Sequence, residues 1–263
     1  MEQVASPGAK PLQPDQAELA RRLTELRERA VSQEAPVLTD FLDPAQLDLA
    51  QWVAGQDERA DRVAAGGYPQ AERRRVAFVP RFYLTELVDL QLAAVEARGD
   101  FRFQAPTHRD CLGSLLGSTG LRREKIGDLV LAEWGCQAVV EREVLPIVLA
   151  QWREIRRVPV AVKEIDLEQL AVPPQRVKEI RATVASLRLD AVAAAGFGES
   201  RTAMVREIKA GHLKLNWRIV TDPAETVQVG DVLSLRGRGR VEIAEATGST
   251  RKGRQGLLLK RLF

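Results

Sequence analysis

The chain has 263 residues, of which 45% are hydrophobic and 29% are charged, so it can bury one large core or two to three small ones. Its 2 cysteines and 2 histidines are too few for a disulfide framework and form no zinc-binding pattern. The sequence shows no apolar signal segment and no run of about 18 uncharged apolar residues. We therefore expect a cytoplasmic protein with no membrane span, no metal and no cofactor.

The net charge of +3 is small, but the positive charge is concentrated toward the C-terminus. From Thr183 onward, 14 Lys and Arg residues stand against 8 Asp and Glu, whereas the rest of the chain carries 25 against 28. A basic C-terminal part in an otherwise slightly acidic chain is typical of a protein that contacts an anion, such as nucleic acid, with that part.

The first part of the chain is predicted to be helical. Residues 1–14 are rich in proline and are expected to form a flexible lead-in. Apolar residues at three- to four-residue spacing predict a helix over 15–31, and Asp43 followed by Pro44 predicts the start of a second helix. A third short helix is expected over 56–65, ended by Gly66 and Gly67. These elements define an N-terminal helical region over residues 15–72.

Residues 73–170 are expected to form a central α/β domain. Short apolar or alternating runs predict strands over 76–80, 101–105, 128–134, 136–143 and 158–165. Helices are expected after the capping residue Thr107 and over 145–155. From residue 101 the order is β-α-β-β-α-β, the arrangement of ferredoxin-like folds and of the RNA recognition motif (RRM). A linker is expected over 171–181.

Residues 182–263 are expected to form a third unit, which begins with two helices over 184–197 and 198–211. Strands follow over 212–220, 231–237, 240–246 and 256–263, with turns at 221–225 and 248–254. The chain as a whole is therefore expected to have an α+β fold in three units.

Basic residues of the third unit form the main candidate RNA-binding site. Ser200 is expected to cap the second helix, so that Arg201 stands beside free backbone N–H groups, which favour a phosphate. Lys214, Asn216 and Arg218 share the parity of one predicted strand, and therefore one face. The full set is Arg188, Ser200, Arg201, Arg206, Lys209, Lys214, Asn216, Arg218, Arg236, Arg238 and Arg240.

Each of these residues also has a purely structural interpretation. Arginines and lysines on strands commonly form a solvated face with no ligand. Asp190 is better explained as a salt-bridging group than as an acid catalyst. Trp217 is either a stacking surface for a base or a half-buried strand residue.

A second group of basic residues lies upstream and supplies secondary candidate contacts: Arg73, Arg74, Arg75, His108, Arg109, Arg122, Arg123 and Lys125. The His-Arg-Asp sequence at 108–110 matches the catalytic loop of protein kinases, but their glycine-rich loop, lysine strand and Asp-Phe-Gly motif are absent. His108, Asp110 and Cys111 are too close along one helix start to form a catalytic triad, and Cys111 is expected to face the core.

Phe101 and Phe103 share one face of a predicted strand, where they either belong to the core or stack on bases. The paired aromatic signature of the RRM is missing from the central domain, so stacking on single strands is not the favoured interpretation there.

The C-terminal pattern resembles the S4 (S-four) RNA-binding domain, first defined in a ribosomal protein. The matching residues, at the spacing of that family, are Arg188-Leu189-Asp190, Ser200-Arg201, Ile208, Gly211, Asn216 and Gly230-Asp231-Val232-Leu233. Met204 and Trp217 depart from the residues that are usual there. The resemblance implies an RNA-binding fold with structured ribosomal or transfer RNA as its target.

Four upstream motifs, together with the S4-like segment, resemble the YlmH family of bacterial RNA-binding proteins. Its cyanobacterial and plastid-type members carry the name photosystem II S4-domain protein. The motifs are F-L-D-P from Phe41, G-G-Y-P-x-A-E-R-R from Gly66, H-R-D-x-L-G-S-L-L-G from His108 and R-E-K-I-G-D from Arg123. The resemblance covers most of the chain. It implies association with the large ribosomal subunit and with stalled, tRNA-bearing complexes in the quality control of translation.

We therefore expect a non-enzymatic, monomeric RNA-binding protein that recognises structured ribosomal or transfer RNA by shape and phosphate contacts. One rival hypothesis is an RNA-modifying enzyme with an appended S4-like domain. A methyltransferase needs a glycine-rich cofactor loop, which is absent, and a pseudouridine synthase carries its Arg-Leu-Asp outside the binding domain, whereas here it lies within. The other rival is a protein-interaction adaptor that uses the acidic N-terminal two-thirds.

Overall fold

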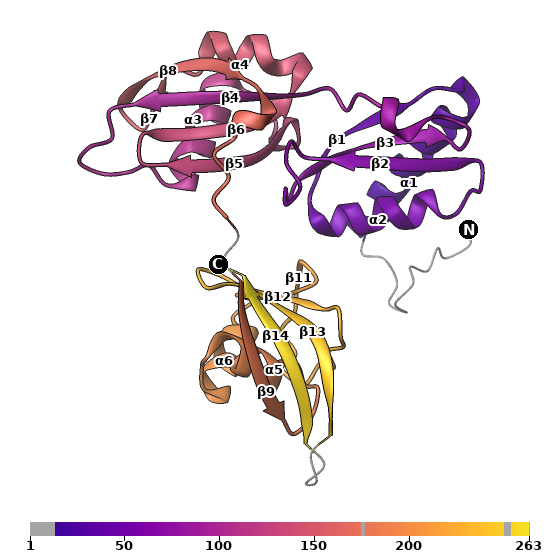
Figure 1. Cartoon of the computed structure of the whole chain (residues 1–263), viewed down its shortest axis with the longest axis vertical. Helices are drawn as coiled ribbons and strands as arrows, with labels where there is room; N and C mark the ends of the chain where they lie inside the picture. The colour runs from indigo at the N-terminus through magenta and orange to yellow at the C-terminus, as the bar shows by residue number, and fades with distance from the viewer. Residues whose placement is uncertain (1–13, 175–176, 250–253, 263) are drawn as a thin grey trace. The chain divides into compact units, whose positions relative to one another are not determined.

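Figure 1 shows the computed structural model of the chain, which describes residues 14–174, 177–249 and 254–262. The chain forms two compact units, Met1–Val172 and Pro173–Phe263, called unit 1 and unit 2 below. Unit 1 holds a three-stranded and a five-stranded sheet, and unit 2 holds a six-stranded sheet. The lead-in expected over 1–14 lies outside the described residues as far as residue 13, and the first helix begins at Pro14.

The first part of unit 1 is an antiparallel sheet in the order β1-β3-β2, which packs against two helices. Val76 and Phe78 of β3 are fully buried beneath apolar residues of these helices. Asp43 caps the second helix as predicted, because its carboxylate accepts a hydrogen bond from the backbone N–H of Gln46 at 3.0 Å. The elements are α1 (Pro14–Gln33), β1 (Val37–Leu42), α2 (Pro44–Ala54), β2 (Ala60–Ala65) and β3 (Arg74–Pro80).

The N-terminal region is therefore α/β, and the prediction of a helical region is wrong. The helix expected over 56–65 is absent, and Ala60–Ala65 forms an edge strand instead. Gly66 does not end a helix but allows a tight turn, since a Cβ there would lie 2.3 Å from the carbonyl oxygen of Arg73. The strand Arg74–Pro80, which was expected to open the central domain, pairs with β1 and β2 of this sheet.

The second part of unit 1 is an antiparallel sheet in the order β5-β6-β4-β8-β7, with two helices on one face. Trp152, Ile126 and Leu115 are the largest fully buried side chains between sheet and helices. Cys111 is also fully buried in this core, as predicted. The elements are β4 (Leu92–Gly99), α3 (His108–Thr119), β5 (Ile126–Ala132), β6 (Gly135–Glu141), α4 (Leu145–Gln151), β7 (Glu154–Ile155) and β8 (Val158–Ile165), with short 3-10 turns at Thr85–Leu87, Arg123–Lys125, Arg142–Val144 and Leu167–Gln169.

The predicted β-α-β-β-α-β order is observed, and β5-β6-β4-β8 is the strand order of a ferredoxin-like sheet. Its first strand is Leu92–Gly99, and the strand expected over 101–105 is wrong. Residues 100–105 instead form a loop, in which Asp100 accepts a hydrogen bond from the backbone N–H of Arg102 and starts a turn. The helix expected over 145–155 ends at Gln151, and β7 follows it.

An apolar cluster joins the two sheets of unit 1. Phe41 of β1 packs there with Ala77 and Val79 of β3, and Leu92 of β4 and Val139 of β6 come from the other sheet. Gly127 of β5 lies directly against the Phe41 ring, because a Cβ on this glycine would be 2.7 Å from the ring atom Cε1. Two of the motifs noted in the sequence, F-L-D-P and R-E-K-I-G-D, therefore meet at this contact.

Unit 2 is a six-stranded antiparallel sheet in the order β11-β10-β12-β13-β14-β9, with helices α5 and α6 on one face. Helix α5 is buried along most of its length, and Met204 and Ile208 are the buried residues of α6. The elements are β9 (Val177–Val184), α5 (Leu189–Phe197), α6 (Arg201–Lys209), β10 (Leu213–Leu215), β11 (Arg218–Ile219), β12 (Val232–Leu235), β13 (Gly239–Ser249) and β14 (Gln255–Leu262).

Unit 2 starts earlier than the sequence indicated. Strand β9 pairs with β14 along its whole length and overlaps both the linker expected over 171–181 and the helix expected from residue 184. That helix begins at Leu189. The strand expected over 212–220 is the hairpin of β10 and β11. Residues 175–176 and 250–253, which include the tip of the turn predicted over 248–254, lie outside the described residues.

Substitution of Gly127, which lies against the Phe41 ring, tests the contact between the two sheets of unit 1. Gly127→Ala forces the Phe41 ring or the strand to move, so we expect the free energy of unfolding to fall by about 1–3 kcal/mol. Gly113→Ala is the matched control, because this glycine lies within α3 and a Cβ there meets nothing within 4 Å. The control is expected to stabilise by about 0.5–1 kcal/mol through helix propensity. Equal effects of the two substitutions in urea unfolding would contradict the packing described.

Candidate nucleic-acid interface

Helices α5 and α6 meet at a buried carboxylate. The side chain of Asp190, in the first turn of α5, is 4% exposed and is neutralised by two arginines. Arg188 donates to it from Nε and Nη2 at 3.2 Å each, and Arg201 donates from the same two atoms at 3.1 Å each. Burial works to raise the pKa of Asp190, but the hydrogen bonds and charges of Arg188 and Arg201 outweigh it and hold the pKa below its usual value. Asp190 is thus a salt-bridging group, as expected.

Arg201 has an environment that the sequence did not indicate. Ser200 caps α6 as predicted, and its Oγ accepts a hydrogen bond from the backbone N–H of Ala203 at 3.1 Å. The guanidinium of Arg201, however, is turned to Asp190, although 54% of the side chain stays exposed. Its planar fork already binds a carboxylate, so a phosphate could use only the remaining N–H groups.

Asn216 holds a turn and does not lie on a strand face. It and Trp217 have φ angles of 46° and 61°, as a two-residue hairpin turn between β10 and β11 requires. The Asn216 Nδ2 donates to Asp231 Oδ1 at 2.8 Å, and its Oδ1 accepts from the backbone N–H of Val232 at 2.8 Å. The S4-like residues Asn216 and Gly230-Asp231 therefore belong to two turns that are held together by these hydrogen bonds.

This hairpin corrects the prediction that Lys214, Asn216 and Arg218 share a face. Lys214 pairs with Ile219, and Arg218 pairs with Leu215. Since residues directly opposite each other share a face and neighbours along a strand alternate, Lys214 and Arg218 lie on opposite faces. Arg236 and Arg238 likewise lie in the turn between β12 and β13 and not on a strand.

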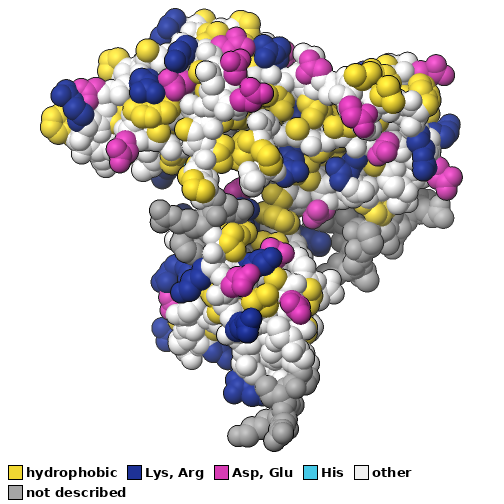
Figure 2. Space-filling model, in the orientation of Figure 1, with side chains coloured by type: hydrophobic (Ala, Val, Ile, Leu, Met, Phe, Trp, Pro, Cys, Tyr) yellow, Lys and Arg dark blue, Asp and Glu magenta, His cyan; other side chains and the backbone are white. Residues whose placement is uncertain are grey.

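Five of the predicted basic residues of unit 2 remain available to a ligand: Arg206, Lys209, Lys214, Arg218 and Arg236. Their side chains are exposed and make no ion pair or side-chain hydrogen bond within the described part of the chain. Arg238 pairs with Glu199 at 2.6 Å but keeps 52% of its side chain exposed, and Arg240 in β13 is half-buried. Figure 2 shows Lys and Arg side chains gathered over the helical side of unit 2.

Arg206 and Lys209 stand on the face of α6 that points away from the core, because the buried residues of this helix are Met204 and Ile208. Arg236 and Arg238, in the turn between β12 and β13, line a hollow beside the same helix with Ala203, Glu199 and Glu207. We call the set Arg206, Lys209, Arg236 and Arg238 the α6 basic face. Its cations come from one helix and one turn, which is the arrangement that suits contacts to successive phosphates.

In unit 1, by contrast, the upstream basic residues are mostly used inside the protein. Arg73 donates to the carbonyl oxygens of Ile126 and Phe41 at 3.1 and 2.8 Å, and Arg123 donates to those of Ile126 and Gly127. Arg74 donates to two carbonyl oxygens within its own turn. Desolvation lowers the pKa of Arg123 to about 10, as expected for an arginine that is largely removed from water.

A buried glutamate explains the positions of Arg75 and Lys125, two further members of the upstream basic group. Glu141 of β6 is fully buried, and Arg75 and Lys125 approach its Oε2 at 2.9 and 3.1 Å. Lys125 also pairs with Asp40 at 2.9 Å, so that the group joins the two sheets of unit 1. Burial raises the pKa of Glu141 to about 7, although both cations act to lower it.

Asp128 is a second carboxylate at the same joint, and sequence reasoning missed it. It accepts hydrogen bonds from the Tyr68 hydroxyl at 2.8 Å and from the backbone N–H groups of Glu72 and Arg73 at 2.6 and 3.1 Å. The G-G-Y-P-x-A-E-R-R and R-E-K-I-G-D motifs are thus in contact. The available signal in the sequence was that each motif carries an acidic residue at a fixed spacing from an arginine.

The other upstream candidates lie at the surface. His108 and Arg109 are in the exposed first turn of α3, and Arg122 keeps 67% of its side chain exposed while it approaches Asp40 at 3.7 Å. Phe103, for which the sequence left core packing and base stacking open, is 99% exposed. Sequence reasoning missed the arginines of the turn between β7 and β8, at 156 and 157. The sequence signal for these two arginines was their adjacent position directly before the strand predicted over 158–165.

Unit 1 contains a ferredoxin-like sheet, and unit 2 presents a basic helix face. Three family models match the chain: the N-terminal domain of YlmH over residues 15–82, the YlmH RNA-binding domain over 86–169 and the S4 domain over 187–233. The "Ribosome-associated protein quality control protein P2" of Bacillus subtilis is 37% identical over 224 residues, which cover 85% of this chain and 86% of that protein. The chain therefore belongs to the YlmH family.

A solved structure shows the same fold. The "Cell division protein ylmH from Streptococcus pneumoniae" superposes with a TM-score of 0.54 at 20% identity, over 61% of this chain and 98% of that one. No helix among the described residues is long and apolar enough to cross a membrane.

The pH dependence of stability tests the environment of Glu141. Its folded-state pKa of about 7 lies above the unfolded value, so the folded protein holds an extra proton between roughly pH 4.5 and 7. The free energy of unfolding should therefore fall as the pH rises through this range, by about 1–3 kcal/mol relative to Glu141→Gln, whose amide does not titrate. Urea unfolding of both proteins at a series of pH values measures the difference. Parallel curves would show that Glu141 is already ionised at the lower pH.

Replacement of Arg201 separates its two possible roles. Arg201→Ala leaves Asp190 with one cationic partner, so we expect the free energy of unfolding to fall by about 1–3 kcal/mol. Arg206→Ala, from the exposed face of the same helix, should change it by no more than about 0.5 kcal/mol. Thermal melting and RNA affinity are measured on both variants. A stable Arg201→Ala protein with a large loss of affinity would identify Arg201 as the phosphate contact that the sequence predicts.

Proposed function

We propose that the protein is a non-catalytic factor that binds structured ribosomal or transfer RNA on the large ribosomal subunit. The observation that carries this proposal is the α6 basic face, whose Arg206, Lys209 and Arg236 have no partner within the described residues. Unpaired cations on a fixed helix and turn match the phosphates of a folded RNA, which are also fixed in space. The relative in Bacillus subtilis, named as ribosome-associated and as a quality control protein, supports the ribosome as the site of action. The cytoplasm is the corresponding location.

The arrangement favours recognition of RNA shape. Cations of the α6 basic face end in guanidinium and ammonium groups that suit phosphate oxygens, and phosphate contacts carry no direct sequence information. A-form helices are bound mostly through such contacts and through their 2′-hydroxyl groups. We infer that this face follows the backbone of a ribosomal or transfer RNA helix, and that the protein acts as a monomer.

The salt dependence of binding tests the proposal. If the α6 basic face contacts phosphates, the logarithm of RNA affinity falls linearly with the logarithm of salt concentration. The double variant Arg206→Ala/Lys209→Ala should reduce the slope by about 1.5, since each lost phosphate contact contributes roughly 0.7–0.9. The measurement is fluorescence anisotropy of the full-length protein with a labelled blunt RNA duplex at several salt concentrations.

The control must lose the same charge elsewhere. Arg21→Ala/Arg29→Ala removes two exposed arginines from α1 and leaves the same net charge as the double variant. We expect it to keep the wild-type slope and affinity. An equal change in both double variants would show that net charge alone drives binding, and an unchanged slope in the α6 variant would contradict the proposed face.

A further inference from the structure

A single phenylalanine stands in water on the loop that follows β4. Phe103 is 99% exposed, while Phe101, two residues before it, is 6% exposed and anchors the loop in the core. A fully exposed phenylalanine gains nothing from the hydrophobic effect in the free protein. The strand expected over 101–105 is a loop, and of the two roles considered for Phe103, core packing and base stacking, its exposure rules out the first.

The loop that carries Phe103 is held in one shape by hydrogen bonds. Asp100 accepts from the backbone N–H of Arg102 at 3.3 Å and from its guanidinium at 2.5 to 3.0 Å. The backbone N–H of Gln104 donates to the carbonyl oxygen of Phe101 at 3.1 Å, and Gln104 Oε1 accepts from Arg156 at 3.0 Å. Phe103 is therefore presented by a braced loop, which lowers the entropic cost of binding.

The surroundings of Phe103 are basic. Arg156 and Arg157 form the two-residue turn between β7 and β8, and they line the hollow on one side of the ring. Arg157 makes no ion pair among the residues that the structure describes. Arg156 has a φ angle of 61°, in the left-handed region that such turns normally fill with glycine or asparagine. Its guanidinium pairs with Asp110 at 3.6 Å and donates to Gln104, so Arg156 braces the loop, whereas Arg157 beside it is the exposed cation.

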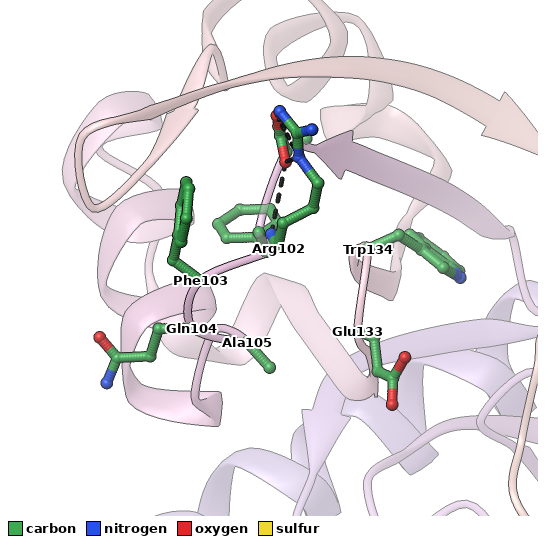
Figure 3. Close-up of a pocket in the computed structure, with 9 residues that line it drawn as sticks. Arg102, Phe103, Gln104, Ala105, Glu133 and Trp134 are labelled. Atoms are coloured by element: carbon green, nitrogen blue, oxygen red, sulfur yellow. Dashed lines mark hydrogen bonds and ion pairs between the residues drawn. The ribbon is translucent and has the colours of Figure 1, made fainter.

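Open hollows lie on both sides of the ring. The one shown in Figure 3, of about 560 Å³, runs from Phe103 past Arg102 to the turn at Glu133 and Trp134. In this view Phe103 and Trp134 stand at opposite sides of the hollow, and the ring of Trp134 is directed away from it. Trp134 instead stacks with the guanidinium of Arg98, 4.2 Å from the ring centroid. Both faces of the Phe103 ring are therefore open to a flat partner.

We propose that Phe103 is a stacking platform for an unpaired RNA base, with Arg157 beside the adjoining phosphate and Arg102 and Arg156 bracing the loop that presents the ring. An exposed aromatic ring among arginines is how proteins bind the bases of single-stranded RNA, since every base has a π-face and every nucleotide a phosphate. Asp100 pairs with Arg102 and Asp110 pairs with Arg156 at 3.6 Å, so the three arginines outnumber their two carboxylate partners and favour a polyanion over an acidic or apolar protein surface. This inference rests on the proposed RNA-binding function and adds a second, single-strand contact in the five-stranded sheet domain of unit 1.

The test compares two RNAs on the full-length protein. Fluorescence anisotropy is measured with a labelled single-stranded 12-nucleotide oligoadenylate and with a labelled blunt 12-base-pair RNA duplex. Phe103→Ala should weaken binding of the oligoadenylate by about 5- to 150-fold, the range for one lost base stack, and leave duplex binding unchanged. Phe103→Trp should preserve binding of both RNAs, because the indole ring can stack. The exposed position makes loss of folding an improbable cause, and thermal melting of each variant checks it.

Phe82→Ala is the matched control, because Phe82 is 71% exposed but lies at the end of β3, outside the loop. It should bind both RNAs as the wild type does. Unchanged oligoadenylate binding by Phe103→Ala, equal weakening for both RNAs, or full binding by Phe103→Leu would each overturn the proposal. Unchanged RNA binding with weaker binding to purified large ribosomal subunits would also overturn it and assign Phe103 to a protein contact. If the wild type binds neither RNA, the proposed function itself fails, whereas duplex binding alone rejects only the stacking platform.

Discussion

A buried carboxylate that must be neutralised is the constraint on which unit 1 depends. Glu141 is fully buried, and an unpaired charge there would cost several kcal/mol. Arg75 comes from the first sheet and Lys125 from the turn before β5, so the two cations reach the ionised glutamate together only when the two sheets meet. The adjacent Asp128 adds three hydrogen bonds from the turn that contains Tyr68. Electrostatics and the apolar cluster around Phe41 thus fix the same joint.

This joint changes the meaning of the basic sequence clusters. Arg73 and Arg75 belong to one basic run of the sequence and Arg123 to another, and such runs suggest RNA contacts. Each of the three side chains is nevertheless turned inward. In unit 2, Arg188 and Arg201 are likewise occupied inside the protein, because they neutralise Asp190 between two helices. On the α6 basic face, Arg206, Lys209 and Arg236 have no carboxylate to neutralise in the described residues, whereas Arg238 pairs with Glu199. Internal charge balance therefore decides which arginines can meet RNA.

The sequence was sufficient where a local rule controls the structure. The caps at Asp43, Thr107 and Ser200, the β-α-β-β-α-β order and the S4-like segment all depend on spacings of a few residues. The predictions failed where partners distant in the chain decide. Ala60–Ala65 is a strand because β3 pairs with it, and β9 is a strand because β14 pairs with it. Likewise, the inward turn of Arg75 depends on Glu141, which lies 66 positions later in the sequence.

In the candidate site, too, local spacing predicts some positions and contacts between distant residues decide the others. Ser200 at the start of α6 and the exposed Arg206 and Lys209 follow from helix periodicity, whereas the environment of Arg201 required the position of Asp190 in space. Asn216 matched the family pattern but serves a turn, because its partner Asp231 is brought to it by the sheet. Phe103 was misplaced, because the alternating F-R-F pattern predicts a strand, whereas contacts of Asp100 and Gln104 hold these residues in a loop.

We propose that internal charge balance separates structural arginines from those that face RNA. Photo-crosslinking of the full-length protein to purified large ribosomal subunits, followed by mass spectrometry of the RNA-linked peptides, tests it most directly. We predict crosslinked peptides from α6, the turn between β12 and β13 and the loop of residues 100–105. Crosslinks concentrated at residues 73–75 and 123–125, with none in α6, would contradict the account.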